Sequence, residues 1–192
     1  RNFDLQTVTR PRLEEVAGET TETAHLAIPV GGDIVFIDRV GSREPLSVTT
    51  QIGAREPMYC TALGKAILAF VEAPELKELV RPPLKRYTRK TAATLADVRR
   101  LLRPVAAGGY AVDDGEYADG IRCIAAPILN DQGYPIAAIG ISGPAFRLPP
   151  EKVRRFGALI RDTGLAISCR AGFDPDHRAL GAARDARGTG TR

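Results

Sequence analysis

Residues 109–144, GYAVDDGEYADGIRCIAAPILNDQGYPIAAIGISGP, decide the fold of this chain. The apolar and β-branched runs within it predict three strands, over 110–113, 121–129 and 136–142. The turn sequence Asn130-Asp131-Gln132-Gly133 joins the second strand to the third. Because this turn is short, the two strands are expected to pair in antiparallel orientation. The second half of the chain is therefore predicted to be mostly sheet.

Upstream of this stretch, the sequence predicts both strands and helices. The turn Gly31-Gly32-Asp33 predicts a hairpin of residues 23–30 and 34–40, and residues 45–51 predict a further strand. Apolar spacing and end signals predict helices over 10–17, 61–71, 74–80 and 94–107, and a long helix from Pro149-Pro150 to near Arg170.

Capping residues suggest where these helices begin and end. The first helix, 9–18 with its caps, is expected to begin at Thr9 and to end at Gly18. Thr94 and Asp97 form a weak version of the capping box for the helix over 94–107. An antiparallel sheet of about six strands with helices packed on it belongs to the α+β fold class.

Composition limits the kind of protein. With 192 residues, 44% hydrophobic and 26% charged, the chain is long enough for one packed domain and is neither disordered nor membrane-bound by composition. Its start lacks the order of a signal peptide, so the cytoplasm is the expected location. Three widely separated cysteines, Cys60, Cys123 and Cys169, fit reduced thiols better than disulfides.

The net charge of +4 arises partly at the C-terminal end. Residues 170–192 contain five arginines and three aspartates, and they lack apolar periodicity. We therefore expect 173–192 to be a flexible tail. No predicted helix has the basic residues and turn of a helix-turn-helix, so any DNA-binding domain is expected to lie outside this chain.

Three kinds of enzyme site match the sequence poorly. Gly64-Lys65 lacks the glycine and the Ser or Thr of a phosphate-binding loop. A hydrolase triad needs a basic histidine, whereas His25 is predicted to be a surface or edge residue and His177 lies in the expected tail. The possible zinc ligands Cys60, Cys123, His25 and Asp113 are far apart in the sequence, so a zinc site could form only if the fold brought them together. We expect no metal and no cofactor.

A second stretch, EPMYCTALGKAILA over 56–69, together with 109–144, resembles the effector-binding domain of IclR-family bacterial transcription regulators. The resemblance extends to about Gly172. It implies a GAF-like or PAS-like fold over 1–172 that senses a small organic acid, is not an enzyme, and assembles as a homodimer or homotetramer. It also implies that DNA is bound only through an N-terminal winged helix-turn-helix, and that no membrane is involved.

The start of the helix over 61–71 is one candidate wall of the effector site. Thr61 is its expected N-cap, and the free N–H groups of the turn at Ala62 and Leu63 suit an anion such as a carboxylate. The small Gly64 fits close approach of a ligand or tight packing against the sheet equally well.

The resemblance carries effector contacts onto seven positions. They are Ala62, Leu63, Asp113, Ile121, Cys123, Gly140 and Ser142. Strand alternation is consistent with this, since residues two apart on a strand share one face. Gly140 replaces a serine found in many members of the family, which is expected to remove one polar contact and add space. Gly115 also interrupts the acidic run usual in the family, and Tyr59 and Cys60 precede the helix where smaller or different residues often occur. Together these departures favour a bulkier aromatic or cyclic acid over a short oxo-acid.

Two other functions remain open on the sequence. One is a GAF-like enzyme that uses a cysteine on a small substrate, which requires an exposed thiolate with a low pKa at Cys60 or Cys123. The other is an assembly domain whose pocket no longer binds a ligand.

Overall fold

A computed structural model describes residues 4–176. Its centre is one six-stranded antiparallel sheet with the order β3-β2-β1-β6-β5-β4. The strands are β1 (Thr23–Val30), β2 (Asp33–Val40), β3 (Arg55–Pro57), β4 (Ala111–Asp114), β5 (Ile121–Leu129) and β6 (Pro135–Pro144). The helices are α1 (Leu5–Thr20), α2 (Ala62–Leu68), α3 (Ala73–Leu79), α4 (Leu95–Gly108) and α5 (Pro150–Arg170), with short 3-10 turns at Met58–Cys60 and Ala145–Arg147. The α+β prediction is confirmed.

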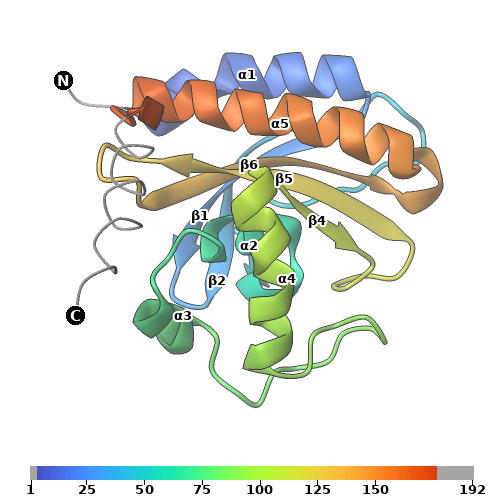
Figure 1. Ribbon diagram of the computed structural model, residues 1–192. Coiled ribbons are helices and arrows are strands. Elements are labelled where there is room, and N and C mark those ends of the chain that lie inside the picture. The colour runs from blue at the N-terminus through green and yellow to red at the C-terminus, as the bar shows by residue number, and fades with distance from the viewer. Residues whose placement is uncertain (1–3, 177–192) are drawn as a thin grey trace.

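The helices cover the two faces of the sheet in separate layers (Figure 1). The long helices α1 and α5 lie side by side across one face, and α2, α3 and α4 lie on the other. Strand alternation divides the apolar residues in the same way, because neighbouring side chains on a strand point to opposite faces. On β5, Ile124 and Ile128 pack toward α1 and α5, whereas Ala125 packs toward α2.

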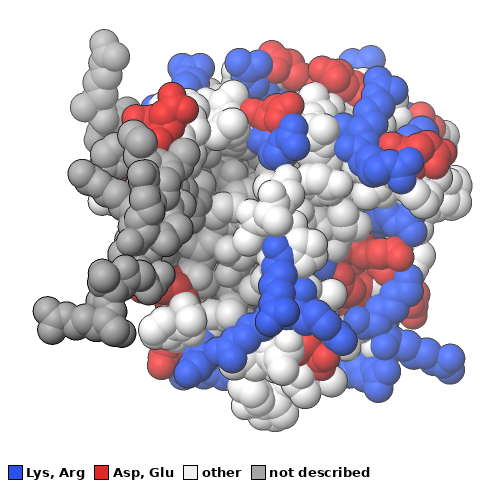
Figure 2. Space-filling model, in the orientation of Figure 1, with Lys and Arg blue, Asp and Glu red and all other residues white. Residues whose placement is uncertain are grey.

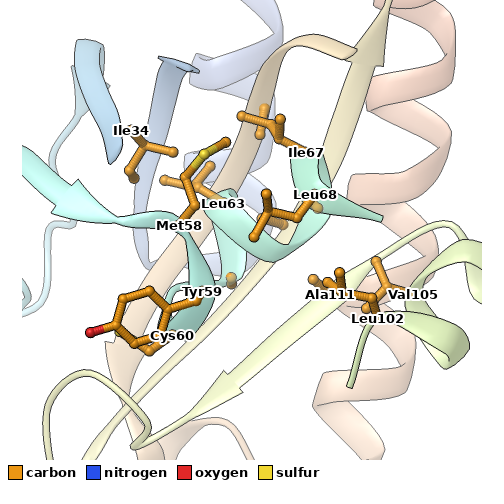
Figure 3. Packing of buried hydrophobic residues seen from close by; sticks show 14 of the residues in the cluster. Ile34, Met58, Tyr59, Cys60, Leu63, Ile67, Leu68, Leu102, Val105 and Ala111 are labelled. Atoms are coloured by element: carbon orange, nitrogen blue, oxygen red, sulfur yellow. The ribbon is translucent and has the colours of Figure 1, made fainter. Parts of the chain in front are cut away.

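Each layer has its own apolar core. Leu13 of α1 and Ile160 of α5 are fully buried against Ile139 of β6 in the first. In the second, Ile67 and Leu68 of α2 are buried (Figure 3). This second core also surrounds the candidate site.

The predicted strand at 45–51 is wrong. The edge of β2 is instead occupied by the residues just downstream, since Gly53 N donates to Phe36 O at 2.8 Å and β3 continues the pairing. Residues 45–51 run as an irregular segment whose carbonyls accept bonds from side chains. Thr23 Oγ1 donates to Val48 O at 2.8 Å and an Arg39 guanidinium N–H to Thr50 O at 2.9 Å.

The first helix extends beyond its predicted limits of 9–18. Asp4, rather than Thr9, is its N-cap, and its carboxylate accepts from Thr7 N. The helix continues through Pro11 and past Gly18 to end at Thr21, which adopts the left-handed conformation with φ 61°. Pro11 therefore stands in the helix interior, and Thr9 is buried there.

The other elements follow the sequence closely. β5 has the predicted bounds, and α2 has the predicted N-cap at Thr61. The capping box of Thr94 and Asp97 forms on α4, and Gly109 ends that helix with φ 76°. Of the expected tail, residues 177–192 lie outside the described part of the chain.

Candidate functional site

The candidate site is a cavity of about 130 Å³ between α2 and the sheet. Its volume is similar to that of cavities of about 150 Å³ that accept a benzene ring. The wall is formed by residues of α2, of five strands and of two irregular segments: Phe36, Val48, Thr49, Thr50, Glu56, Thr61, Ala62, Leu63, Asp113, Tyr117, Ala118, Ile121, Cys123, Ile124, Ile141 and Ser142.

Seven of the eight site residues expected from the sequence line this cavity. Thr61, Ala62 and Leu63 come from the start of α2, which packs against the sheet. The other four come from neighbouring strands. Asp113 of β4 is paired with Cys123 of β5, which is paired with Ser142 of β6, so these three form one row across the sheet. Ile121 precedes Cys123 by two residues on the same face.

Gly140 does not line the cavity. A Cβ atom at this position would come within 2.5 Å of Ile124 O and 2.8 Å of Ala125 Cβ. The glycine is thus needed for close packing between β5 and β6, and the space expected there is already occupied. An effector contact by Gly140 has no support in this geometry.

Close packing also explains Gly64. Its Cβ would approach Met58 Cα to 2.2 Å, so glycine lets α2 start directly against the preceding 3-10 turn rather than against the sheet. Thr61 Oγ1 donates to Pro57 O at 2.9 Å and accepts from Gly64 N at 3.2 Å. The N–H groups of Ala62 and Leu63 belong to the first helical turn, where no intrahelical acceptor exists.

Sequence reasoning missed nine of the sixteen residues that line the cavity. Glu56 is opposite Ile34 in the pairing of β3 with β2, so it shares the face of that buried residue. Phe36 stands two positions further along β2 on the same face. Residues 48–50 reach the cavity only because they are not a strand. The missing information was which residues pair with β2. Once Glu56 is known to lie opposite the buried Ile34, the alternation of side chains along the strands places Glu56 on the inner face.

The cavity contains two carboxyl groups and, among its described lining residues, no Lys, Arg or His. Burial, with a smaller effect of Asp113, raises the pKa of Glu56 to about 7. Burial also raises the pKa of Asp113 to about 6, against the effect of the hydrogen bond that it accepts from Glu116 N at 2.6 Å. Both groups therefore titrate near neutral pH.

A buried ion pair supports the loop that carries Asp113. Lys65 of α2 pairs with Glu116, and both side chains are at least nine-tenths buried. Lys65 Nζ also donates to Val112 O at 2.7 Å. Thr88 and Thr91 hydroxyls donate to the carbonyls of Gly115 and Glu116 at 2.7 Å each. The loop is thereby tied both to α2 and to the segment before α4.

The cysteines lack the properties of a catalytic thiol. Burial, and then Asp113, raises the pKa of the Cys60 and Cys123 thiols above the ordinary value. Both are therefore thiols rather than thiolates at neutral pH, which contradicts the requirement of a cysteine-dependent enzyme.

His25 is not at the surface or at an edge, contrary to the prediction. It is fully buried on β1, which lies between β2 and β6. Burial, and then Arg39, lowers its pKa to about 3, so the ring is neutral. Its Nδ1 lies 3.1 Å from Thr50 Oγ1, behind the cavity wall. The imidazole therefore supports Thr50 from the core side.

Other features of residues 4–176 bear on function. No three His, Cys, Asp or Glu side chains in this part are grouped as a metal site requires. None of the helices described combines the length and apolar character needed to cross a membrane. Basic and acidic side chains are interspersed on the face shown in Figure 2. Exposed ion pairs among the described residues include Arg10 with Glu14 and Arg81 with Glu78.

Known proteins are similar to this chain over most of its length. The family model for the C-terminal part of the bacterial transcriptional regulator IclR matches residues 1–169. The HTH-type transcriptional repressor AllR of Klebsiella pneumoniae is 34% identical over 175 residues, which are 91% of this chain and 64% of AllR. The HTH-type transcriptional regulator KdgR of Escherichia coli is 32% identical, over 90% of this chain and 66% of KdgR. The chain thus spans about two thirds of these relatives.

Solved structures agree in fold. The Thermotoga maritima IclR structure has a TM-score of 0.84 and 34% identity, covering 90% of this chain and 70% of that one. The C-terminal domain of E. coli KdgR has a TM-score of 0.80 and 31% identity, covering 89% of this chain and all (100%) of that domain.

Proposed function

The chain belongs to the family of IclR C-terminal domains of bacterial transcriptional regulators, and from this we propose that the cavity beside α2 is an effector site. Binding of an effector in this cavity would change the state of a DNA-binding domain. One observation carries the proposal. Seven residues that were chosen from the sequence, and that belong to four separate elements, line the same cavity. A vestigial pocket would not be expected to keep such a mixed set of polar and apolar side chains around open space.

The proposed ligand is a small organic acid. The cavity has room for a compact molecule with about one ring. Its apolar wall, including Phe36, Leu63 and Ile121, suits the body of such a molecule. The N–H groups of Ala62 and Leu63 suit its carboxylate, since N–H groups at a helix start favour an anion. The domain then acts as a sensor and not as an enzyme.

We further propose that the sensor acts in the cytoplasm as a homodimer or homotetramer, with DNA contacted by an N-terminal helix-turn-helix domain. Ligand binding would shift the equilibrium between two arrangements of the assembly. Exposed apolar side chains support self-association. Phe146 is 73% and Leu46 60% exposed, and Arg147 links the two by donating to Leu46 O at 2.7 Å. Light scattering should show a species larger than the monomer at tens of micromolar.

A thermal-shift panel of organic acids and their amides tests the site. At least one acid is expected to raise the melting temperature and its amide is not, because only the acid gains charge-assisted bonds from the N–H groups. Ala62→Leu should abolish the shift by filling the cavity, whereas Ala96→Leu, on the exposed surface of α4, should leave it unchanged. Ser142→Ala should weaken binding by about 1 kcal/mol. Persistent binding in Ala62→Leu would place the ligand elsewhere.

A further inference from the structure

The positive charge of the chain is concentrated in one short stretch. Residues 81–103, which we call the basic segment, contain one acidic residue, Asp97, and eight basic ones. The basic residues are Arg81, Lys85, Arg86, Arg89, Lys90, Arg99, Arg100 and Arg103. The other 169 residues contain nineteen basic and twenty-two acidic side chains, so the chain without this segment has a net charge of −3. The overall charge of +4 therefore depends on this segment.

The basic segment lies on the side of the sheet opposite α1 and α5, at the lower end of the molecule in Figure 1. It consists of the irregular stretch 81–94 and the first part of α4, residues 95–103. All eight basic residues are exposed; on α4, Val98 is buried, whereas Arg99 and Arg103 are on the outer side. In Figure 2, blue side chains extend over α4 and along the lower edge of the view. The positive charge thus faces solvent.

Most of this charge is not neutralised by the protein itself. Three of the eight side chains form exposed ion pairs, namely Arg81 with Glu78, Lys90 with Asp114 and Arg100 with Asp97. The other five form no ion pair with any of residues 4–176. Arg99 and Arg103 are four residues apart on α4, where like charges repel each other. An anionic partner would relieve this repulsion.

Hydrogen bonds fix the backbone of the basic segment. The hydroxyls of Thr88 and Thr91 join it to the loop after β4, at 2.7 Å each. The Arg86 guanidinium donates to Thr88 O and Arg89 O, both at 3.1 Å. Because this part of the chain is ordered before a partner arrives, less conformational entropy is lost on binding.

Two features favour the phosphates of a nucleic acid over an acidic protein surface. Duplex DNA carries one negative charge per about 1.7 Å of its axis, so it can face several basic side chains at once. Six of the eight are arginines, whose planar guanidinium suits a phosphate group. A protein interface usually has an apolar centre, whereas Tyr87 is the one large hydrophobic side chain of the segment that is exposed.

We propose that residues 81–103 bind the phosphate backbone of duplex DNA without regard to base sequence. The inference rests on the proposed function in one respect, since the DNA-binding domain proposed there would bring a duplex to this protein. Contacts from the basic segment would add affinity to the contacts of that domain. The effector-binding domain would thereby hold DNA through a surface of its own.

Fluorescence anisotropy with a labelled duplex of random sequence, in 50 to 200 mM NaCl, tests the inference on the 192-residue chain. The wild-type chain should bind, and its affinity should fall steeply with salt, because bound cations release counterions from the duplex. Alanine at Arg89, Arg99 and Arg103 should weaken binding about tenfold or more in 50 mM NaCl. It should also reduce the slope of log K against log [NaCl] by about 2–3. Lysine at these three positions should restore most of the binding.

Two charge-matched variants are the controls. One removes three exposed basic side chains of α5, and the other removes three arginines near the C-terminal end of the chain. Each should weaken binding less than threefold. The positions changed to alanine are Lys152, Arg154 and Arg155 in the first and Arg184, Arg187 and Arg192 in the second. Thermal melting followed by circular dichroism checks that every variant is folded.

Several results would overturn the inference. An equal loss in the α5 variant would assign binding to overall charge, and a loss confined to the C-terminal variant would assign it to that end. Undetectable binding by the wild-type chain in 50 mM NaCl would exclude the surface. Displacement of the duplex by poly-glutamate as readily as by unlabelled duplex would indicate an acidic protein partner instead. None of these results bears on the effector cavity, which the panel of acids and amides tests separately.

Discussion

The two acids that line the cavity differ from a buried acid on the other face of the sheet. Glu22, buried just before β1 and in contact range of Gly143, has both carboxylate oxygens bound by Arg147, at 2.8 and 2.6 Å. On the α2 face, Asp113 and Glu56 line open space with no basic side chain in the wall. A paired acid belongs to the folded architecture, whereas acids left beside a cavity remain available to a ligand.

The apolar cores on the two faces of the sheet also differ, in how completely side chains fill them. Between the sheet and α1 and α5, large side chains such as Leu13 and Ile160 are completely buried. Against α2, the packing leaves a cavity of about 130 Å³. We infer that the first layer mainly supplies stability and that the second gives up some stability for binding.

The largest effect should come from breaking the one buried ion pair that holds the cavity loop. Lys65→Met leaves Glu116 buried without its cation, which should lower the free energy of unfolding by about 3–5 kcal/mol. Adding Glu116→Gln should recover part of the loss, because the uncompensated charge is removed. Urea unfolding measures both variants. A loss below 1 kcal/mol for Lys65→Met would mean that the loop does not depend on this pair.

A matched pair of isoleucine variants compares the layers directly. Ile160→Ala should cost about 2–5 kcal/mol, because the residue is fully buried in close-packed surroundings. Ile121→Ala, at the half-buried cavity wall, should cost clearly less than Ile160→Ala, since less burial is lost there. Urea unfolding gives both values. Equal losses would contradict the distinction between a packed layer and a binding layer.

A smaller effect should appear in the pH dependence of stability. The pKa values of Glu56 and Asp113 are raised to about 7 and about 6 in the folded chain. A raised pKa means that the folded state holds protons which the unfolded state has lost, so this contribution is complete below about pH 4 and disappears as the pH rises through 6 to 7. Relative to Glu56→Gln, the wild-type chain should lose on the order of 1–2 kcal/mol between pH 5 and pH 8. A constant difference between the two proteins would show that Glu56 titrates normally.

Local signals explain which features could be predicted. Caps at Thr61 and Thr94, and alternation along β5, depend on neighbours in the sequence, and they are found as expected. Seven site residues could be identified because a family resemblance supplied positions that alternation then placed on one face.

Long-range pairing explains what could not be predicted. Whether 45–51 or 55–57 pairs with β2 depends on contacts across the fold, and this choice turned the predicted strand into part of the cavity wall. The pairing of residues 55–57 with β2 also places Glu56 in the cavity wall. His25 was misplaced because its strand lies at the centre of the sheet, which its own sequence does not reveal.

The central claim, that ligand binds on the α2 face, is tested most directly by NMR of isoleucine methyl groups. The chain is labelled at its isoleucine methyls and titrated with the acid that most raises its melting temperature. Binding in this cavity should produce a large shift of the Ile121 signal, at the cavity wall, with Ile160 and Ile167 on α5 nearly unchanged. Shifts at Ile160 and Ile167 with a constant Ile121 signal would contradict it.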